Sequence, residues 1–174
     1  IKNDWFEGEY DEIAFFGGVL SQEEVYSLYQ ENDPSLMAYY PFEGGVSDVS
    51  GNGKHGEAVN NPGYTYGIKG YAIHFNGTNQ YVKLDDLETS RSFTVSFWVN
   101  PEDNGDWHAM LGKHESTGKN LFMVGFYEGG FHIDLGEETY TVSGVKWLGW
   151  QHIILSVRYI SDDMSEITMF RNGS

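Results

Sequence analysis

Apolar residues in this chain fall mostly at every second position of short runs. In residues 93–99, Phe93, Val95 and Phe97 alternate with polar or outward positions, which is the period of a half-buried strand. Similar β-branched and aromatic runs occupy residues 81–84, 121–127, 131–135, 139–142, 152–160 and 167–170. Turn sequences rich in glycine and asparagine, such as NGTN, EDNGD and STGKN, separate these runs. The pattern predicts an all-β fold, an antiparallel two-sheet sandwich of the jelly-roll type.

One segment has a helical pattern instead. Ser21 and Glu24 form a capping box, because each side chain can bond the other residue's backbone amide. Val25 and Leu28 then fall on one face at helical spacing. We expect one short helix over residues 22–30.

A long stretch from Gly44 to Gly70 is rich in glycine and asparagine. We expect it to be an irregular loop. A loop of that length in a compact domain is usually functional or held by a ligand.

The charge balance excludes some partners. The 174 residues, about the size of one domain, include 10 Lys and Arg against 26 Asp and Glu, a net charge of −16. Such a charge repels nucleic acid and anionic lipid, and no apolar run is long enough to insert into a membrane. Cysteine is absent, so disulfides and thiolate metal sites are excluded. Many carboxylates without thiols suit hard cations such as calcium.

Several segments together resemble a known family. They are LMAYYPFEGGVSDVSGNGKHGEAVNNP (residues 36–62), GYAIHFNGTNQYVKL (70–84), RSFTVSFWVNP (91–101), WQHIILSVRY (150–159) and ITMFRNG (167–173). In this order they resemble laminin-G-like domains of the concanavalin A-like lectin/glucanase superfamily, in the branch that also looks like pentraxins. The resemblance implies a jelly-roll fold and a binding function.

The order of the segments is unusual. Residues 5–30 resemble the closing strand and closing helix of the family, yet they precede the opening strand. Residues 1–33 are therefore either the tail of a preceding tandem module or part of one circularly permuted domain that spans residues 1–174. The second interpretation is favoured, because Tyr10 and Ile13 would otherwise lie exposed to water.

The permuted interpretation predicts a specific strand pairing. Residues 10–16 should pair antiparallel with residues 36–42, since the first and last strands of the family are neighbours in a sheet. The sequence ends at residues 172–174, where the family continues with a further strand. The resulting open edge predicts tandem or edge-strand association with a neighbouring chain.

A glycine-rich turn carries the candidate metal ligands. Asp48 and Asn52 stand in D-x-S-G-N-G, where carboxylate, amide and backbone oxygens could surround a calcium ion. The alternative is that both side chains only form Asx-turns with their own backbone. The resemblance favours a structural calcium, and it implies Asp11 and Glu43 as further ligands.

No catalytic residues are predicted. Glu7, Glu9, Asp11 and Glu12 superficially resemble the paired carboxylates of glycosidases, but they lack the Glu-x-Asp-x-x-Glu spacing of the glucanases. The six histidines show no zinc spacing. We therefore expect a protein that is not an enzyme.

Two aromatic residues are candidate ligand contacts. Trp107 and Tyr127 border glycine-rich loops, where an exposed ring could stack on a sugar; alternatively, both are ordinary half-buried sheet residues. The expected function is a non-catalytic, calcium-containing binding module of an extracellular or cell-surface protein, which recognises carbohydrate or a protein partner. A structural spacer in a tandem adhesin and a glycoside hydrolase of the same superfamily are the alternatives.

Overall fold

The computed structural model describes residues 5–20, 35–84, 92–102, 108–114, 120–127, 130–136, 138–143, 147, 149–161 and 164–173. These residues form thirteen strands in three antiparallel sheets. The predicted helix over residues 22–30 lies outside the described residues.

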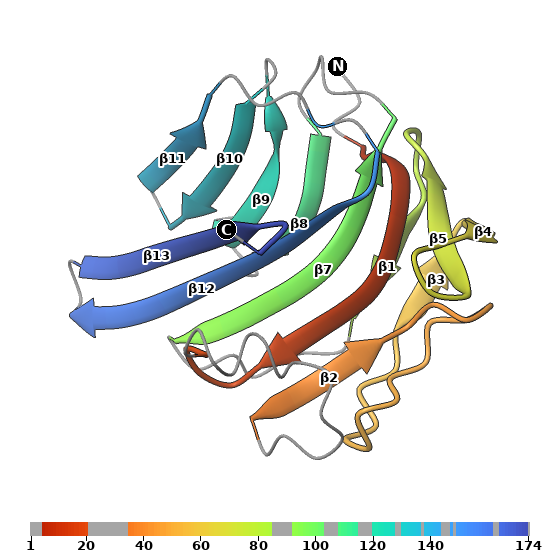
Figure 1. Ribbon diagram of the computed structural model, residues 1–174, viewed down its shortest axis with the longest axis horizontal. Coiled ribbons are helices and arrows are strands. Elements are labelled where there is room, and N and C mark those ends of the chain that lie inside the picture. The colour runs from red at the N-terminus through yellow and green to blue at the C-terminus, as the bar shows by residue number, and fades with distance from the viewer. Residues whose placement is uncertain are drawn as a thin grey trace.

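The largest sheet has seven strands (Figure 1). Their order is β13, β12, β7, β1, β5 and β4, with β2 also paired to β1. The strands are β1 (Glu7–Phe16), β2 (Leu36–Tyr40), β4 (Gly63–Tyr66), β5 (Tyr71–Asn76), β7 (Phe93–Pro101), β12 (Gln151–Ser161) and β13 (Met164–Arg171). The predicted pairing of residues 10–16 with the opening strand is confirmed: β1 and β2 are antiparallel, and Ile13 lies opposite Tyr40. The assignment of residues 1–33 to this domain or to a preceding one stays a prediction.

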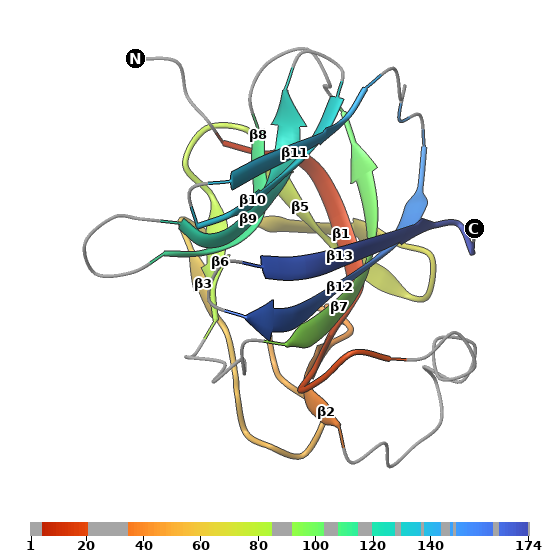
Figure 2. The ribbon, with the colours of Figure 1, turned by 90° about the vertical axis from the view of Figure 1, so that its left-hand side faces the viewer.

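A four-stranded sheet packs against the large one. Its order is β11 (Glu138–Val142), β10 (Gly130–Leu135), β9 (Asn120–Tyr127) and β8 (His108–His114). The core lies between the two sheets and includes Phe97 and Ile153 from the large sheet and Val124 and Phe131 from the small one, all without exposed surface. Figures 1 and 2 show the two curved layers, and they confirm the predicted sandwich. Fully buried Trp147 stacks on Phe131 with ring centroids 5.0 Å apart.

Two short strands in the stretch 44–70 contradict one expectation. β3 (Glu57–Val59) pairs with β6 (Tyr81–Lys83), and β4 pairs with β5, so two strands lie within the stretch 44–70 that we expected to be an irregular loop. Both strands are short, and their residues are mostly exposed. Such strands lack the alternation of buried positions on which the prediction relied.

Candidate functional site

A bulge in β1 turns two consecutive carboxylates into the protein. Neighbouring residues of a regular strand point to opposite faces. Here the register between β1 and β7 shifts between Asp11 and Ala14, and Glu12 has a positive φ of 53°. As a result, the exposed fraction is 0% for Asp11 and 5% for Glu12.

Only one carboxylate oxygen of Asp11 has a partner among the described residues. Its Oδ2 accepts hydrogen bonds from the backbone amides of Ile68 (2.8 Å) and Lys69 (3.1 Å), whereas its buried Oδ1 accepts none. Burial raises the pKa of Asp11 to about 6, and the nearby charge of Glu12 raises it further against the effect of the amide hydrogen bonds. The Asp11 carboxylate is therefore costly to keep charged without a cation.

Among the described residues, Glu12 also has one carboxylate oxygen with a partner and one without. Its Oε2 accepts a hydrogen bond from the Tyr39 hydroxyl and lies 3.9 Å from the exposed Lys69 ammonium. Its buried Oε1 has no hydrogen-bond partner in the described part of the chain. Two adjacent carboxylates thus each leave one buried oxygen without a donor, which is unusual in a native protein.

Glu43 approaches the same turn of the chain. The turn at residues 67–70 joins β4 to β5, and its amides also bind Asp11. Glu43 Oε2 accepts a hydrogen bond from the Tyr71 amide (3.1 Å), and its carboxylate lies against Gly70, where an added Cβ would be 2.0 Å from Oε1. The structure therefore brings Asp11 and Glu43 to one turn, and their role as calcium ligands stays a prediction.

Asp48 has a different environment. Its Oδ1 accepts hydrogen bonds from the amides of Tyr39 (2.9 Å) and Ser50 (2.8 Å), and its Oδ2 accepts one from the amide of Lys54 (2.9 Å). Burial acts to raise the pKa of Asp48, but these hydrogen bonds outweigh it and hold the pKa below its ordinary value. The bond to Ser50 is the Asx-turn of the alternative interpretation.

Asn52 fastens the same loop to β2. Its side-chain amide donates hydrogen bonds to the carbonyls of Leu36 (2.9 Å) and Met37 (3.1 Å). The loop that contains Asp48 and Asn52 is thus held by its own polar side chains. A calcium ion at Asp48 would have to displace amide donors, and Asp48 and Asn52 as ligands stay predictions.

Asp11 and Glu12 each carry a buried oxygen of the kind that calcium binds. Calcium takes six to eight oxygen ligands, preferably carboxylates and carbonyls. The unpartnered Asp11 Oδ1 and Glu12 Oε1 are buried carboxylate oxygens of the required kind. Both lie on β1, beside the turn that Glu43 also contacts. A cation beside either oxygen would offset the cost of its buried charge.

A second polar cluster crosses three strands of the large sheet. His74 Nδ1 lies 3.5 Å from Glu9 Oε1 and 3.5 Å from Glu102 Oε1, and Asn100 donates a hydrogen bond to Glu9 (2.9 Å). One potential ligand atom from each of Glu9, His74 and Glu102 lies within 4.8 Å of the other two. Spacing along the sequence could not reveal this cluster, because strand pairing places Glu9 opposite His74 and Asn100.

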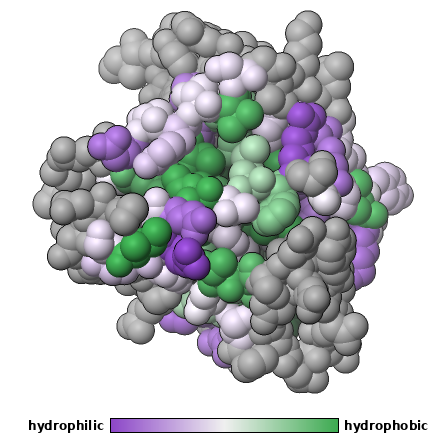
Figure 3. Space-filling view, turned by 60° about the vertical axis from the view of Figure 1, so that its left-hand side comes forward, coloured by the Kyte–Doolittle hydropathy of each residue, from purple (hydrophilic) through white to green (hydrophobic). Residues whose placement is uncertain are grey.

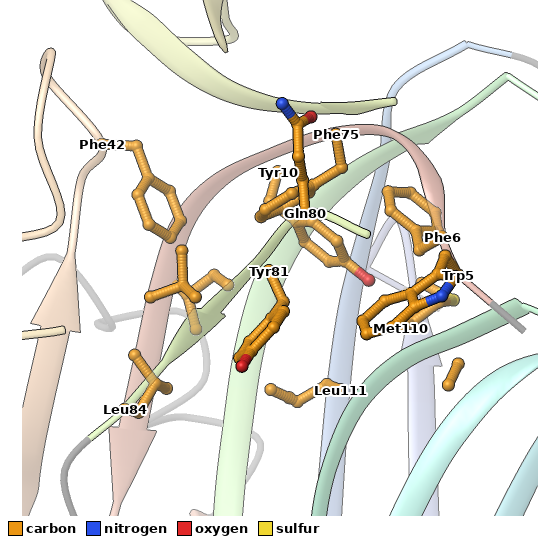
Figure 4. A pocket seen from close by; sticks show the side chains of 13 residues that line it. Trp5, Phe6, Tyr10, Phe42, Phe75, Gln80, Tyr81, Leu84, Met110 and Leu111 are labelled. Carbon is orange, nitrogen blue, oxygen red and sulfur yellow. The ribbon is translucent and has the colours of Figure 1, made fainter. Parts of the chain in front are cut away.

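An apolar pocket opens between the edges of the two smaller sheets (Figure 4). It has a volume of about 420 Å³. Its walls are Trp5, Phe6, Tyr10, Ile13, Phe42, Phe75, Gln80, Tyr81, Val82, Leu84, Ala109, Met110 and Leu111. Trp5 and Tyr81, exposed by 37% and 41%, stack with ring centroids 5.7 Å apart. The Tyr10 hydroxyl is buried and has no hydrogen-bond partner among the described residues.

Comparison with known proteins agrees with this architecture. A laminin G family model of the concanavalin A-like lectin/glucanases superfamily matches residues 76–174, more than half of the chain. The chain belongs to this superfamily. No curated protein and no solved structure matches the sequence of this chain significantly. In the described part of this concanavalin A-like domain, no helix is long and apolar enough to cross a membrane.

The candidate sites of this concanavalin A-like domain were only partly visible in its sequence. The resemblance implies Asp11 and Glu43, whereas Glu12 is only one member of an acidic cluster in the sequence. Its one sequence feature is its position directly after Asp11, and the bulge that turns it inward leaves no mark in the hydrophobic pattern. Trp107 lies outside the described residues, and Tyr127 lies at the end of β9 with only its backbone described.

Proposed function

We propose that this concanavalin A-like domain is a non-catalytic, calcium-containing binding module of an extracellular protein, which recognises carbohydrate or a protein partner. The observation that carries the proposal is the open apolar pocket with the stacked rings of Trp5 and Tyr81 at its mouth. Binding sites are typically concave and mostly apolar, and the walls of this pocket are of that kind.

The exposed rings suit the proposed ligands. The C–H face of a sugar is apolar and packs on an aromatic ring, while the hydroxyl rim forms hydrogen bonds. Tyrosine and tryptophan are also the residues that contribute most to protein interfaces. A structural spacer needs neither a defined groove nor exposed aromatic rings, so the pocket supports a binding module over a spacer.

Calcium supports this function as a structural ion. We propose Asp11, Glu12 and Glu43 as contributors to its site, because Asp11 and Glu12 each carry a buried oxygen that lacks a donor among the described residues. The ion would tie β1 to the turn at residues 67–70 and offset part of the net charge of −16. Laminin-G-like domains are typically extracellular, where free calcium is abundant, so a weak site would be filled there.

A glycan-array screen tests the carbohydrate arm of the proposal. The protein is applied in calcium and in chelator, together with Tyr81→Ala and the control Tyr66→Ala, whose ring is also exposed but lies outside the pocket. We expect binding to a small set of glycans that Tyr81→Ala weakens at least tenfold or so, because stacking is lost, and that Tyr66→Ala leaves unchanged. Equal binding by all three proteins would contradict a pocket site, and released sugar fragments would contradict the non-catalytic assignment.

A further inference from the structure

The outer face of the large sheet, which points away from the core, carries a polar cluster that spans β5, β1 and β7. Glu9 of β1 lies opposite His74 of β5 on one side and opposite Asn100 of β7 on the other. Residues directly opposite each other project from the same face of a sheet. The alternate positions, such as Tyr10 and Val99, are buried in the core. Strand pairing therefore brings these polar side chains together.

Glu102 reaches the same place from the end of β7. Its amide donates a hydrogen bond to the carbonyl of Glu7 (3.1 Å), which holds the chain beside β1 after β7 ends. Its Oε1 lies 3.5 Å from His74 Nδ1, and Glu9 Oε1 also lies 3.5 Å from that nitrogen. One imidazole nitrogen thus faces two carboxylate oxygens that come from different parts of the sheet.

These distances suit a shared metal ion better than hydrogen bonds. An N–H···O hydrogen bond measures about 2.7–3.2 Å, and a charge-assisted one lies at the short end of that range. Zinc binds imidazole nitrogen and carboxylate oxygen at about 2.0–2.2 Å in tetrahedral geometry, so two of its ligand atoms lie roughly 3.3–3.6 Å apart. Both contacts of His74 Nδ1, at 3.5 Å, have this spacing.

A further hydrogen bond orients Glu9. Asn100 Nδ2 donates to Glu9 Oε2 (2.9 Å), while Glu9 Oε1 faces His74. Outer hydrogen bonds of this kind fix the carboxylates that hold metal ions. In the described part of the chain, neither Glu9 nor Glu102 is ion-paired with a lysine or arginine. A bound cation would therefore supply the positive charge that the two carboxylates lack.

The ligand types select the kind of ion. The net charge of −16 attracts cations to the whole molecule but selects no position. On the face shown in Figure 3, for example, hydrophilic side chains lie in separate places around apolar ones. The Glu9 cluster differs because three potential ligand atoms converge, one of them an imidazole nitrogen. Calcium and magnesium take oxygen ligands, whereas imidazole together with carboxylates suits zinc.

We propose that Glu9, His74 and Glu102 bind one zinc ion on the outer face of the large sheet. Three protein ligands leave the fourth tetrahedral position open to water. The ion links β5, β1 and β7 in a chain that has no cysteine and so no disulfide. This site goes beyond the proposed function, because none of its residues lines the apolar pocket or belongs to the proposed calcium site.

Calorimetric titration of the chelator-treated protein with zinc chloride, in a buffer that contains calcium, tests this site. We expect one zinc ion per chain with a micromolar dissociation constant, weaker than that of a closed four-ligand site. His74→Gln should raise the dissociation constant roughly a hundredfold, because the imidazole ligand is lost, and Glu9→Gln should raise it at least tenfold or so. The matched control is His132→Gln, which replaces a histidine of β10 that contacts Thr141 and should bind zinc like the wild type.

Thermal unfolding provides a second measurement. Saturating zinc should raise the melting temperature of the wild type by about 5 °C and leave that of His74→Gln unchanged, because the ion binds only the folded state. Circular dichroism shows whether each variant is folded. If His74→Gln does not fold, Glu102→Gln changes a more exposed side chain and should weaken zinc binding at least tenfold or so.

The possible outcomes are distinct. A dissociation constant above about 1 mM, or equal weakening by His74→Gln and His132→Gln, would overturn the inference. Displacement of zinc by an equal concentration of calcium would also overturn it, because it would indicate a site made of oxygen ligands alone. The proposed calcium site and the pocket do not include His74, so a protein that binds calcium and glycans but no zinc would refute this inference and leave the proposed function standing.

Discussion

Asp48→Ala is expected to lower the free energy of unfolding by about 3 kcal/mol, because it leaves three backbone amides without their acceptor. Hydrogen bonds to a charged group contribute more than neutral ones, and the pKa of Asp48 below its ordinary value reflects this stabilisation. The loss should be the same in calcium and in chelator. Urea unfolding followed by tryptophan fluorescence measures it.

Two variants serve as controls for Asp48→Ala. Asp48→Asn keeps an oxygen acceptor for Tyr39 and Ser50 and should lose only part of the stability. Glu57→Ala changes an exposed carboxylate on β3 and should stay within about 0.5 kcal/mol of the wild type. If Asp48→Ala is destabilising only in the presence of calcium, Asp48 is a metal ligand and its hydrogen bonds are not what holds the loop.

In chelator, lowering the pH from 7.5 to 4 is expected to raise the free energy of unfolding of the wild type, relative to that of Asp11→Asn, by roughly 2 kcal/mol. The pKa of Asp11 rises from 3.8 in the unfolded chain to about 6 in the folded protein, mainly because of burial. The folded state therefore binds more protons between these two values. The stability that protonation of Asp11 contributes to the folded state is fully present below pH 3.8 and is lost as the pH rises through 6.

The comparison with Asp11→Asn isolates this effect from an opposing one. Burial lowers the pKa of His152, so its contribution to stability is lost as the pH falls below 6.5. His152 is present in both proteins, so its effect cancels in the difference. Glu57→Gln should follow the wild type at every pH. A difference between wild type and Asp11→Asn that does not change with pH would show that the buried carboxylate does not titrate in this range.

The hydrophobic pattern was sufficient to predict the fold class but not the local irregularities. Runs of β-branched and aromatic residues indicate β7 and β12, which lie next to each other in the large sheet, and both strands were predicted within two residues of their ends. β8 was missed because its register shifts twice against β9, so its apolar residues do not alternate. The pairing of β1 with β2 came from the resemblance to the family, since no local pattern specifies contacts between distant strands.

The candidate metal site shows the same limit. A regular strand would put Asp11 and Glu12 on opposite faces, and only the bulge with the positive φ at Glu12 brings both inside. Which of the acidic residues are buried therefore depends on a backbone detail that the sequence does not encode in its periodicity. By contrast, Asp48 stands out in the sequence by its glycine-rich turn, and the Asx-turn that was the alternative to a metal site there is present.

Calorimetric titration of the chelator-treated protein with calcium chloride tests the proposed calcium-containing module most directly. We predict one ion per chain, with a dissociation constant between roughly 10⁻⁴ and 10⁻³ M, as in extracellular modules. A hundredfold excess over that constant should raise the melting temperature by about 5 °C. Glu12→Gln should weaken binding at least tenfold or so, whereas Glu57→Gln should not change it. No heat of binding together with an unchanged melting temperature, or equal binding by wild type and Glu12→Gln, would contradict a calcium centre at Asp11 and Glu12.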